Sequence, residues 1–555
     1  MVGVPSSRGC RNCRRKKKGC DLVRPTCARC AHLGYDCTYD DKRWTFVGHK
    51  VPPAESSRAS SATSAVQATT ELQRVTPPQG PSQRSLSRTA WETQWAGQFW
   101  THFLPQEDPS TVFVGNVRIV PWMGAVMDMA AKDATARMAL NAVAFTIIGR
   151  AKSDQSLVRE STRLYSVAIR ETSRALQDVN KARSDEILAC CKILALYENF
   201  RVKDTPEVST QGFDWHSHID GTQSLIEMRG PARHSTDHGH VLFKDIRIMT
   251  ATSSITRRKP SEFTNPVWSV SWYLLNSVLD VADRFLHRHT TPFETSPKSL
   301  HDELVDIMLT LPELLAEQDN LNGRLAACQT AFARFEAFTA GQNLLYRCIN
   351  MGEQLNEWQH KVLRESAAVS PTPASTSNTT IADICMKHGY GLFNCITQCW
   401  VTCLILYSTT RIIHRTLTYA AQGTRSGLPE IPPWMNPYPM AMCIASHAHH
   451  YFEDSARYWG ASIASFPLGI VAHYCAASGN LDSECMTELR RLYRMNDRGQ
   501  LTLEFLRSIA NTGSPVKGDP VNPDMHRKMA TAWYRISEGR EGQSPPEGRG
   551  SLQQS

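Results

Sequence analysis

Long apolar runs are missing from this sequence of 555 residues. No stretch approaches the roughly 18 consecutive apolar residues that identify a membrane-spanning helix. The best candidate, from Cys395 to Tyr407, is interrupted by Gln398 and two threonines. The N-terminus also lacks an apolar stretch, because Met1–Pro5 leads directly into charged residues. We therefore expect a soluble, intracellular protein whose N-terminal cysteines stay reduced and available to metal ions.

Most of the chain carries no net charge. The first fifty residues hold 12 lysines and arginines against 4 acidic residues, whereas the other 505 residues hold 49 basic and 49 acidic side chains. The net charge of +8 therefore belongs entirely to the N-terminal segment. This distribution excludes a uniformly basic enzyme and indicates a basic head on a neutral body.

Common catalytic and nucleotide-binding motifs are also absent, since the sequence contains no G-x-S-x-G, no P-loop and no G-x-G-x-x-G. Three groups in the body still carry side chains capable of metal or acid–base chemistry. They are Cys443, His447, His450 and Asp454 on one expected helix face; Cys395, Cys399 and Cys403, spaced four apart; and His216 and His218 near Asp214 and Asp220. For each group, packing in a helical core is the favoured interpretation over a site, because buried free cysteine and histidine are ordinary.

Six of the 17 cysteines are concentrated near the N-terminus, with the spacing Cys10-x2-Cys13-x6-Cys20-x6-Cys27-x2-Cys30-x6-Cys37. Each C-x2-C pair can present two thiolates to one zinc ion, which binds sulfur tetrahedrally at about 2.3 Å. Six thiolates complete two four-coordinate sites only if two of them bridge both ions. The similarity of the two halves makes Cys10 and Cys27 the natural bridges. A single zinc site with spare thiols and six incidental cysteines are the competing interpretations.

These residues resemble the fungal binuclear Zn2Cys6 cluster transcription factors, with matching segments at Gly9–Asp21 and Arg24–Cys30. The resemblance implies two zinc ions per chain. One would be held by Cys10, Cys13, Cys20 and Cys27, and the other by Cys10, Cys27, Cys30 and Cys37. Six thiolates and two Zn²⁺ leave the cluster at −2, so the loaded head is nearer +6 than +8. A head this small lacks a hydrophobic core, so metal binding would supply its folding energy.

The basic run Arg14–Lys18 lies on the short helix expected between Cys13 and Cys20. In this family that helix enters the major groove of double-stranded DNA, and its lysines read a CGG-type triplet. By motif position, Lys16 and Lys17 are the candidates for contacts to base edges. The candidates for phosphate contacts are Arg11, Arg14, Arg15, Lys18 and Arg29. A nuclear-import signal is the alternative interpretation of this run. Both can be true, and both imply a nuclear protein.

Two positions affect the geometry of the head. Gly19 stands where family members usually carry Lys or Arg, and glycine readily ends a helix. We therefore expect the short helix to stop one residue early, with the loss of one phosphate contact. The resemblance also suggests a cis bond before Pro25, in the turn between the two halves.

The rest of the chain divides by composition. Beyond the cluster domain at 8–40, residues 51–90 contain 13 Ser/Thr and 5 Pro, which predicts a disordered linker. Residues 91–510 are expected to form a large all-α regulatory domain, interrupted by a disordered loop at 369–380. Residues 511–555 are expected to be a mostly disordered tail, with a possible short helix at 525–537. Strand patterns are scarce. Helical periodicity occurs at Trp91, Trp95, Phe99 and Phe103, and over 160–178, 184–200, 215–229, 323–363, 382–413, 438–458 and 482–508.

The resemblance continues more weakly into this helical body, at Ala195–Phe200, Trp215–Gly221, Leu225–Pro231 and Phe466–Leu468, which are similar to segments of the family's regulatory region. Trp215, Ile219, Thr222 and Ile226 form one apolar stripe, so they are predicted to be core residues, and Gly230-Pro231 is predicted to end their helix.

The leading hypothesis is a sequence-specific, DNA-binding RNA polymerase II transcription factor without enzymatic activity. The alternatives are a zinc-dependent enzyme with the cysteine head as an appendage, and an RNA- or protein-interaction protein. Expected partners are promoter DNA, the transcription machinery and a second copy of the chain. A monomer is also compatible, because 51–90 lacks a sustained heptad pattern. Residues 511–555 carry 6 basic and 5 acidic side chains, so the tail is no acidic activation segment. The resemblance further implies control of a fungal gene cluster for a secondary metabolite.

Overall fold

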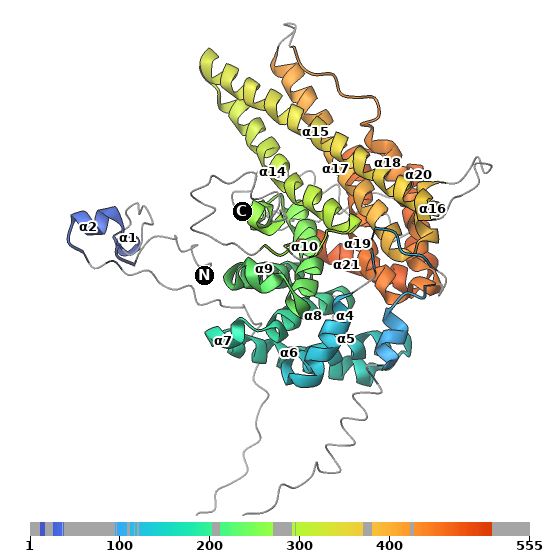
Figure 1. Ribbon diagram of the computed structural model, residues 1–555. Helices are drawn as coiled ribbons and strands as arrows, with labels where there is room; N and C mark the ends of the chain where they lie inside the picture. Colours follow the sequence, from blue (N-terminus) through green and yellow to red (C-terminus); the bar gives the residue numbers. More distant parts are fainter. Residues whose placement is uncertain are drawn as a thin grey trace, which may run out of the picture.

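The computed structural model of the protein is helical in every regular element it describes (Figure 1). The described residues are 11–16, 26–35, 37, 95, 97–107, 111–115, 117–118, 121–201, 211–269, 291–294, 296–369, 380–421 and 427–512, and no strand occurs among them. The all-α body expected from the sequence is confirmed. The predicted linker at 51–90 and the possible helix at 525–537 lie outside these residues, as does 370–379 of the expected loop.

The first part of the body is a bundle built around one central helix. Its elements are α4 (Trp122–Lys132), α5 (Ala134–Ala151), α6 (Gln155–Ala175), α7 (Val179–Ala182), α8 (Asp185–Phe200), α9 (Gln211–Arg229), η1 (Pro231–His234), α10 (Asp237–Arg257), η2 (Glu262–Thr264) and α11 (Pro266–Ser269). Helix α5 packs against α4, α6 and α8, and residues 139–149 are all buried. Because an all-round buried helix has no polar face, α5 lacks a helical hydrophobic period. This explains why the sequence did not predict it.

The second part is organised around two long helices and a buried one. Its elements are α14 (Leu300–Ala327), α15 (Ala331–Val369), α16 (Ile381–Lys387), α17 (Tyr390–Ala420), α18 (Pro437–His447), η3 (Ala448–Phe452), η4 (Asp454–Ala456), α19 (Arg457–Ala477), α20 (Glu484–Met495) and α21 (Asp497–Thr512). Helices α14 and α15 form a hairpin that projects from the body together with the end of α17 (Figure 1). Helix α17 packs against α14, α15, α18 and α19 and so forms the centre of this part.

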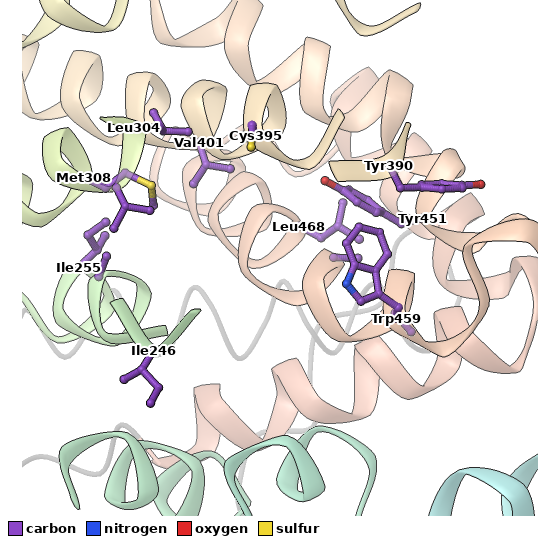
Figure 2. Close-up of a cluster of buried hydrophobic side chains, with 14 of the residues drawn as sticks. Ile246, Ile255, Leu304, Met308, Tyr390, Cys395, Val401, Tyr451, Trp459 and Leu468 are labelled. Atoms are coloured by element: carbon purple, nitrogen blue, oxygen red, sulfur yellow. The ribbon is translucent and has the colours of Figure 1, made fainter. Parts of the chain in front are cut away.

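The apolar core runs through both parts without interruption. Figure 2 shows side chains of α10, α14 and α17 together with Tyr451 of η3 and Trp459 and Leu468 of α19. Leu304, Val401 and Leu468 are each fully buried. Two segments, Tyr390–Ala420 and Asp454–Ala477, are long and apolar enough to cross a membrane, but 83% and 56% of their most apolar windows are buried inside the body. This burial is what core helices of a folded domain show.

Several predicted helices are confirmed, whereas others are divided at identifiable residues. The patterns at 160–178, 184–200 and 215–229 correspond to α6, α8 and α9. The pattern at 323–363 spans the connection between α14 and α15, which breaks at Cys328. The pattern at 382–413 is broken before α17 at Gly389, whose φ of 93° favours glycine. The pattern at 482–508 divides at the extended residue Asn496. Helices α4, α5, α10 and most of α14 were not predicted.

The core stripe predicted on α9 is confirmed. Trp215, Ile219, Thr222 and Ile226 are all buried, and α9 ends at Arg229, before Gly230 at a φ of 78°. Of the four aromatic residues near the start of the body, Phe99 and Phe103 are buried with their rings stacked 5.2 Å apart, and Trp95 packs against the same core. Trp91 lies outside the described residues.

Candidate metal centre and nucleic-acid interface

Two five-residue helices build the cysteine-rich head, α1 (Arg11–Arg15) and α2 (Ala28–His32). Each begins directly after the first cysteine of a C-x2-C pair and carries the second cysteine at its third position. The thiol sulfur of Cys27 accepts a hydrogen bond from the Cys30 backbone N–H at 3.4 Å, so it caps the start of α2. Helix α1 already includes Cys13, so the helix expected between Cys13 and Cys20 begins earlier than predicted.

The sulfur atoms of the two halves converge. The Sγ atoms of Cys13, Cys27 and Cys30 all lie within 4.8 Å of one another, and all three side chains are buried. Cys13 Sγ and Cys27 Sγ are 3.8 Å apart. Four sulfurs around a zinc ion at about 2.3 Å are separated by about 3.8 Å in a regular tetrahedron, so this pair already has the spacing of two ligands to one ion.

Cys27 lies at the centre of this arrangement. Its sulfur is next to Cys13 of the first half and Cys30 of the second, and its backbone N–H donates to Cys37 Sγ at 3.2 Å. A sulfur shared between the two halves fits the bridging role predicted for Cys27. Cys10, the other predicted bridge, and Cys20 lie outside the described residues.

Among the described residues of the head, the buried side chains are mainly cysteines. Its buried cluster consists of Cys13, Cys27 and Cys30, with Cys37 packed against it. No aliphatic or aromatic side chain belongs to that cluster among the head residues that the structure describes. The buried thiols of the described head residues cover too little apolar surface to fold a domain, so we expect metal ligation to stabilise the head.

The head also carries basic side chains. Arg15, Lys16 and Arg29 are exposed, and the ammonium of Lys16 lies 3.3 Å from the centre of the Tyr35 ring. Arg11 and Arg14 belong to α1. Lys17 and Lys18 lie outside the described residues, as do Gly19 and Pro25. The assignment of these side chains to bases or phosphates therefore stays a prediction. Tyr35 was not singled out from the sequence, where attention fell on cysteines and cations.

Comparison with known families agrees with this geometry. Residues 8–44 match the family described as the fungal Zn(2)-Cys(6) binuclear cluster domain, and residues 109–431 match the fungal specific transcription factor domain. The second match covers more than half of the sequence, so the chain belongs to the fungal-specific transcription factor family. Its head is a domain that binds two zinc ions. One description names a zinc cluster and the other a transcription factor domain, and neither names a reaction.

Similarity to individual proteins is more limited. An uncharacterized protein of Emericella nidulans, AN5342, is 25% identical over 186 residues. The match covers 33% of this chain and 38% of that relative, so the chain aligns with little more than a third of the relative's length. No solved structure matches the chain.

The cysteines of α17 are core residues, as the sequence analysis favoured. Cys395, Cys399 and Cys403 are all buried to 1% exposure or less. Burial raises the pKa of the Cys399 thiol well above its usual value, and hydrogen bonding to Cys403 adds to this rise. A thiol that stays protonated is a poor metal ligand and nucleophile, so Cys399 has a packing role.

The expected single helix face with Cys443, His447, His450 and Asp454 does not form. Helix α18 ends at His447, and the chain continues in the tighter 3-10 turns η3 and η4. Because these turns do not have the α-helical period, His450 and Asp454 no longer line up with Cys443 and His447. Asp454 instead pairs with Arg498 at 2.9 Å.

A different trio, His449, His450 and Glu453, has its ligand atoms within 4.8 Å of one another. Hydrogen bonds account for it without a metal ion. His449 Nδ1 is 2.9 Å from the Ser446 carbonyl, and His450 Nδ1 is 2.8 Å from a Glu453 carboxylate oxygen. Because each imidazole has a hydrogen-bond partner in the protein, we interpret this trio as a local polar cluster.

His216 and His218 also contact side chains of the helical body. His216 Nδ1 lies 2.8 Å from the Ser253 hydroxyl, and His218 Nε2 lies 3.0 Å from the Tyr165 hydroxyl. Asp220 pairs with Arg257 rather than with either histidine. These contacts fix the packing of α9 against α6 and α10.

Buried histidines make the body sensitive to acid. Burial lowers the pKa of His234 to about 4, with the neighbouring Arg229 contributing, against a usual value of 6.5. Between pH 6.5 and 4 the unfolded chain binds a proton that the folded chain does not, so stability falls as the pH is lowered through this range. We expect His234→Asn to reduce the proton uptake on unfolding at pH 5 by about one proton. Denaturant titrations at pH 5 and pH 7 measure this.

The matched control for that experiment is His360→Asn, because His360 is exposed on α15. This variant is expected to keep the pH dependence of the unmodified chain. Equal pH dependence for all three proteins would show that His234 is not held neutral by burial.

Proposed function

We propose that this protein is a sequence-specific, DNA-binding RNA polymerase II transcription factor that reads a CGG-type triplet in the major groove. The observation that carries the proposal is the convergence of the Cys13, Cys27 and Cys30 sulfurs in a head that also exposes Arg15, Lys16 and Arg29. A metal cluster of this kind holds two short helices rigidly without a hydrophobic core. Rigid placement of a cationic helix is what major-groove reading requires.

The six cysteines of the head are assigned to the metals, with Cys10 and Cys27 as bridges. Lys16 and Lys17 are assigned to base edges, where an ammonium donates to guanine O6 and N7. Arg11, Arg14, Arg15, Lys18 and Arg29 are assigned to phosphates. Phosphate contacts add affinity and salt dependence without sequence preference. The two lysines therefore carry the specificity of the complex.

The helical body is assigned a regulatory role in the nucleus, where it would connect the head to the transcription machinery. Its contacts are those of a packed scaffold. The histidines considered as candidate site residues, His216, His218 and His450, form hydrogen bonds within the body. Control of a gene cluster for a secondary metabolite is the target class that the family resemblance implies. Mapping genome occupancy of the protein in its host tests this target class, and the spacing of triplets at occupied sites reports whether it binds as a homodimer.

Competition binding separates this function from its alternatives. The zinc-loaded full chain is titrated with a labelled CGG duplex in the presence of unlabelled duplex DNA, or of single- and double-stranded RNA of the same sequence. We expect duplex DNA to compete best and a chelator to abolish binding. Preferential competition by RNA would instead support an RNA-interaction protein. Zinc retained after mutation of the head cysteines would support a metalloenzyme in residues 91–510.

A further inference from the structure

The contact between Lys16 and Tyr35 joins the two halves of the head. Lys16 directly follows α1, and Tyr35 lies in the segment after α2. The Lys16 ammonium lies over the face of the Tyr35 ring, 3.3 Å from its centre. Such an arrangement is a cation–π interaction, in which the negative face of the ring attracts the charge.

Each partner is tied to the cysteine framework through its backbone. The Lys16 N–H donates to the Asn12 carbonyl at 3.0 Å, which holds it one turn beyond the start of α1, three residues after Cys13. The Tyr35 N–H donates to the Cys30 carbonyl at 3.0 Å. Gly34 precedes it with a φ of 61°, a left-handed conformation that turns the chain after α2. The cluster that holds the cysteines therefore also determines where the ammonium and the ring meet.

The contact also leaves Lys16 able to bind DNA. A lysine ammonium has three N–H donors, and a ring on one side leaves donors free on the other. Both side chains are exposed, with Tyr35 at 40%, so the free side of the ammonium faces solvent. A lysine side chain is flexible and loses conformational entropy when a base fixes it. Holding the ammonium in advance reduces that loss in the complex.

We propose that Tyr35 is a positioning residue that orients the Lys16 ammonium toward the base edge and thereby increases the preference for the CGG triplet. This inference rests on the proposed function, in which Lys16 contacts a base. It makes the second half of the cluster, which contributes few cations, part of the sequence readout.

The experiment measures dissociation constants of the zinc-loaded full chain for a CGG duplex and a scrambled duplex. We expect Tyr35→Leu to lower the ratio of the two constants about two- to fivefold, the effect of losing an exposed cation–π contact. Tyr35→Phe keeps an aromatic face and is expected to retain the ratio. Leu33→Ala alters an exposed apolar residue of the same turn and serves as the matched control, with an unchanged ratio.

Two further readouts separate positioning from a structural role. A merely structural Tyr35 would, on replacement by leucine, lose zinc and weaken both duplexes equally. The positioning role predicts two zinc ions and an unchanged salt slope. In the Lys16→Ala background, Tyr35→Leu is expected to have no additional effect on the ratio, because the group that it orients is gone.

The possible failures are distinguishable. If the unmodified chain does not prefer the CGG duplex, the proposed function fails. If it does, but Tyr35→Leu keeps the full ratio, the positioning role of Tyr35 is overturned. The same conclusion follows if phenylalanine lowers the ratio as much as leucine, or if Tyr35→Leu acts equally in the Lys16→Ala background.

Discussion

Replacing Cys27 with serine is expected to remove both zinc ions from the head and to abolish specific DNA binding. The Cys27 sulfur lies 3.8 Å from that of Cys13 and caps α2, so one substitution disturbs both halves. A serine hydroxyl is a poor substitute for a thiolate ligand to zinc. Because metal binding folds the head, we expect affinity for the CGG duplex to fall to the non-specific level, about a thousandfold lower. Metal analysis and a binding titration measure the two effects.

Cys328→Ser is the matched control for this substitution. Cys328 lies between α14 and α15, is partly exposed and donates its S–H to the Arg324 carbonyl at 3.0 Å. The control is expected to retain two zinc ions and full affinity. A Cys27→Ser chain that keeps both ions would contradict the bridging assignment.

Replacing Arg247 with methionine is expected to cause a large loss of stability in the body. Arg247 is fully buried on α10 and forms ion pairs with Asp306 and, at 3.9 Å, with Asp302 of α14. Its guanidinium also lies 5.0 Å from the centre of the Phe293 ring. Methionine keeps much of the apolar contact but removes the charge and leaves the aspartates short of a partner. We expect the free energy of unfolding to fall by about 3 kcal/mol, the lower end for a broken buried pair, because lysines also contact both aspartates.

The control for Arg247 is Arg347→Met, which removes an ion pair at the surface. Arg347 pairs with Glu317 at 2.7 Å and with Glu313 at 3.0 Å, but its side chain is 45% exposed. An exposed pair of this kind contributes less than about 1 kcal/mol. Denaturant unfolding followed by far-ultraviolet circular dichroism compares the two variants. Equal losses would show that the buried pairs do not join α10 to α14 as described.

The zinc cluster was the most predictable feature of the molecule. Ligand number and coordination geometry constrain cysteine spacing whatever the surroundings, so the spacing of six cysteines, together with the family resemblance, predicted a two-metal head. The structure brings Cys13, Cys27 and Cys30 together as expected. The Lys16–Tyr35 contact could not be predicted in the same way, because it joins residues 19 positions apart and depends on the turn at Gly34.

In the body, amphipathic helices were predictable and fully buried ones were not. Helix α6 has a polar face and was found, whereas α5 is buried on all sides over 139–149 and carries no periodic signal. Helix ends were the other source of error. The 3-10 turns after His447 moved His450 and Asp454 off the expected helix face, so a candidate metal site disappeared with the helix that supported it.

The central claim is that the head reads a CGG triplet, and a paired binding titration tests it most directly. The zinc-loaded full chain and its Lys17→Ala variant are each titrated with a CGG duplex and a scrambled duplex at fixed salt. The account predicts tighter binding of the CGG duplex by the unmodified chain and a preference at least tenfold smaller in the variant, the equivalent of about 1.4 kcal/mol for one lost base contact. Equal binding of both duplexes, with a steep salt dependence only, would contradict the account and make the head a non-specific cationic anchor.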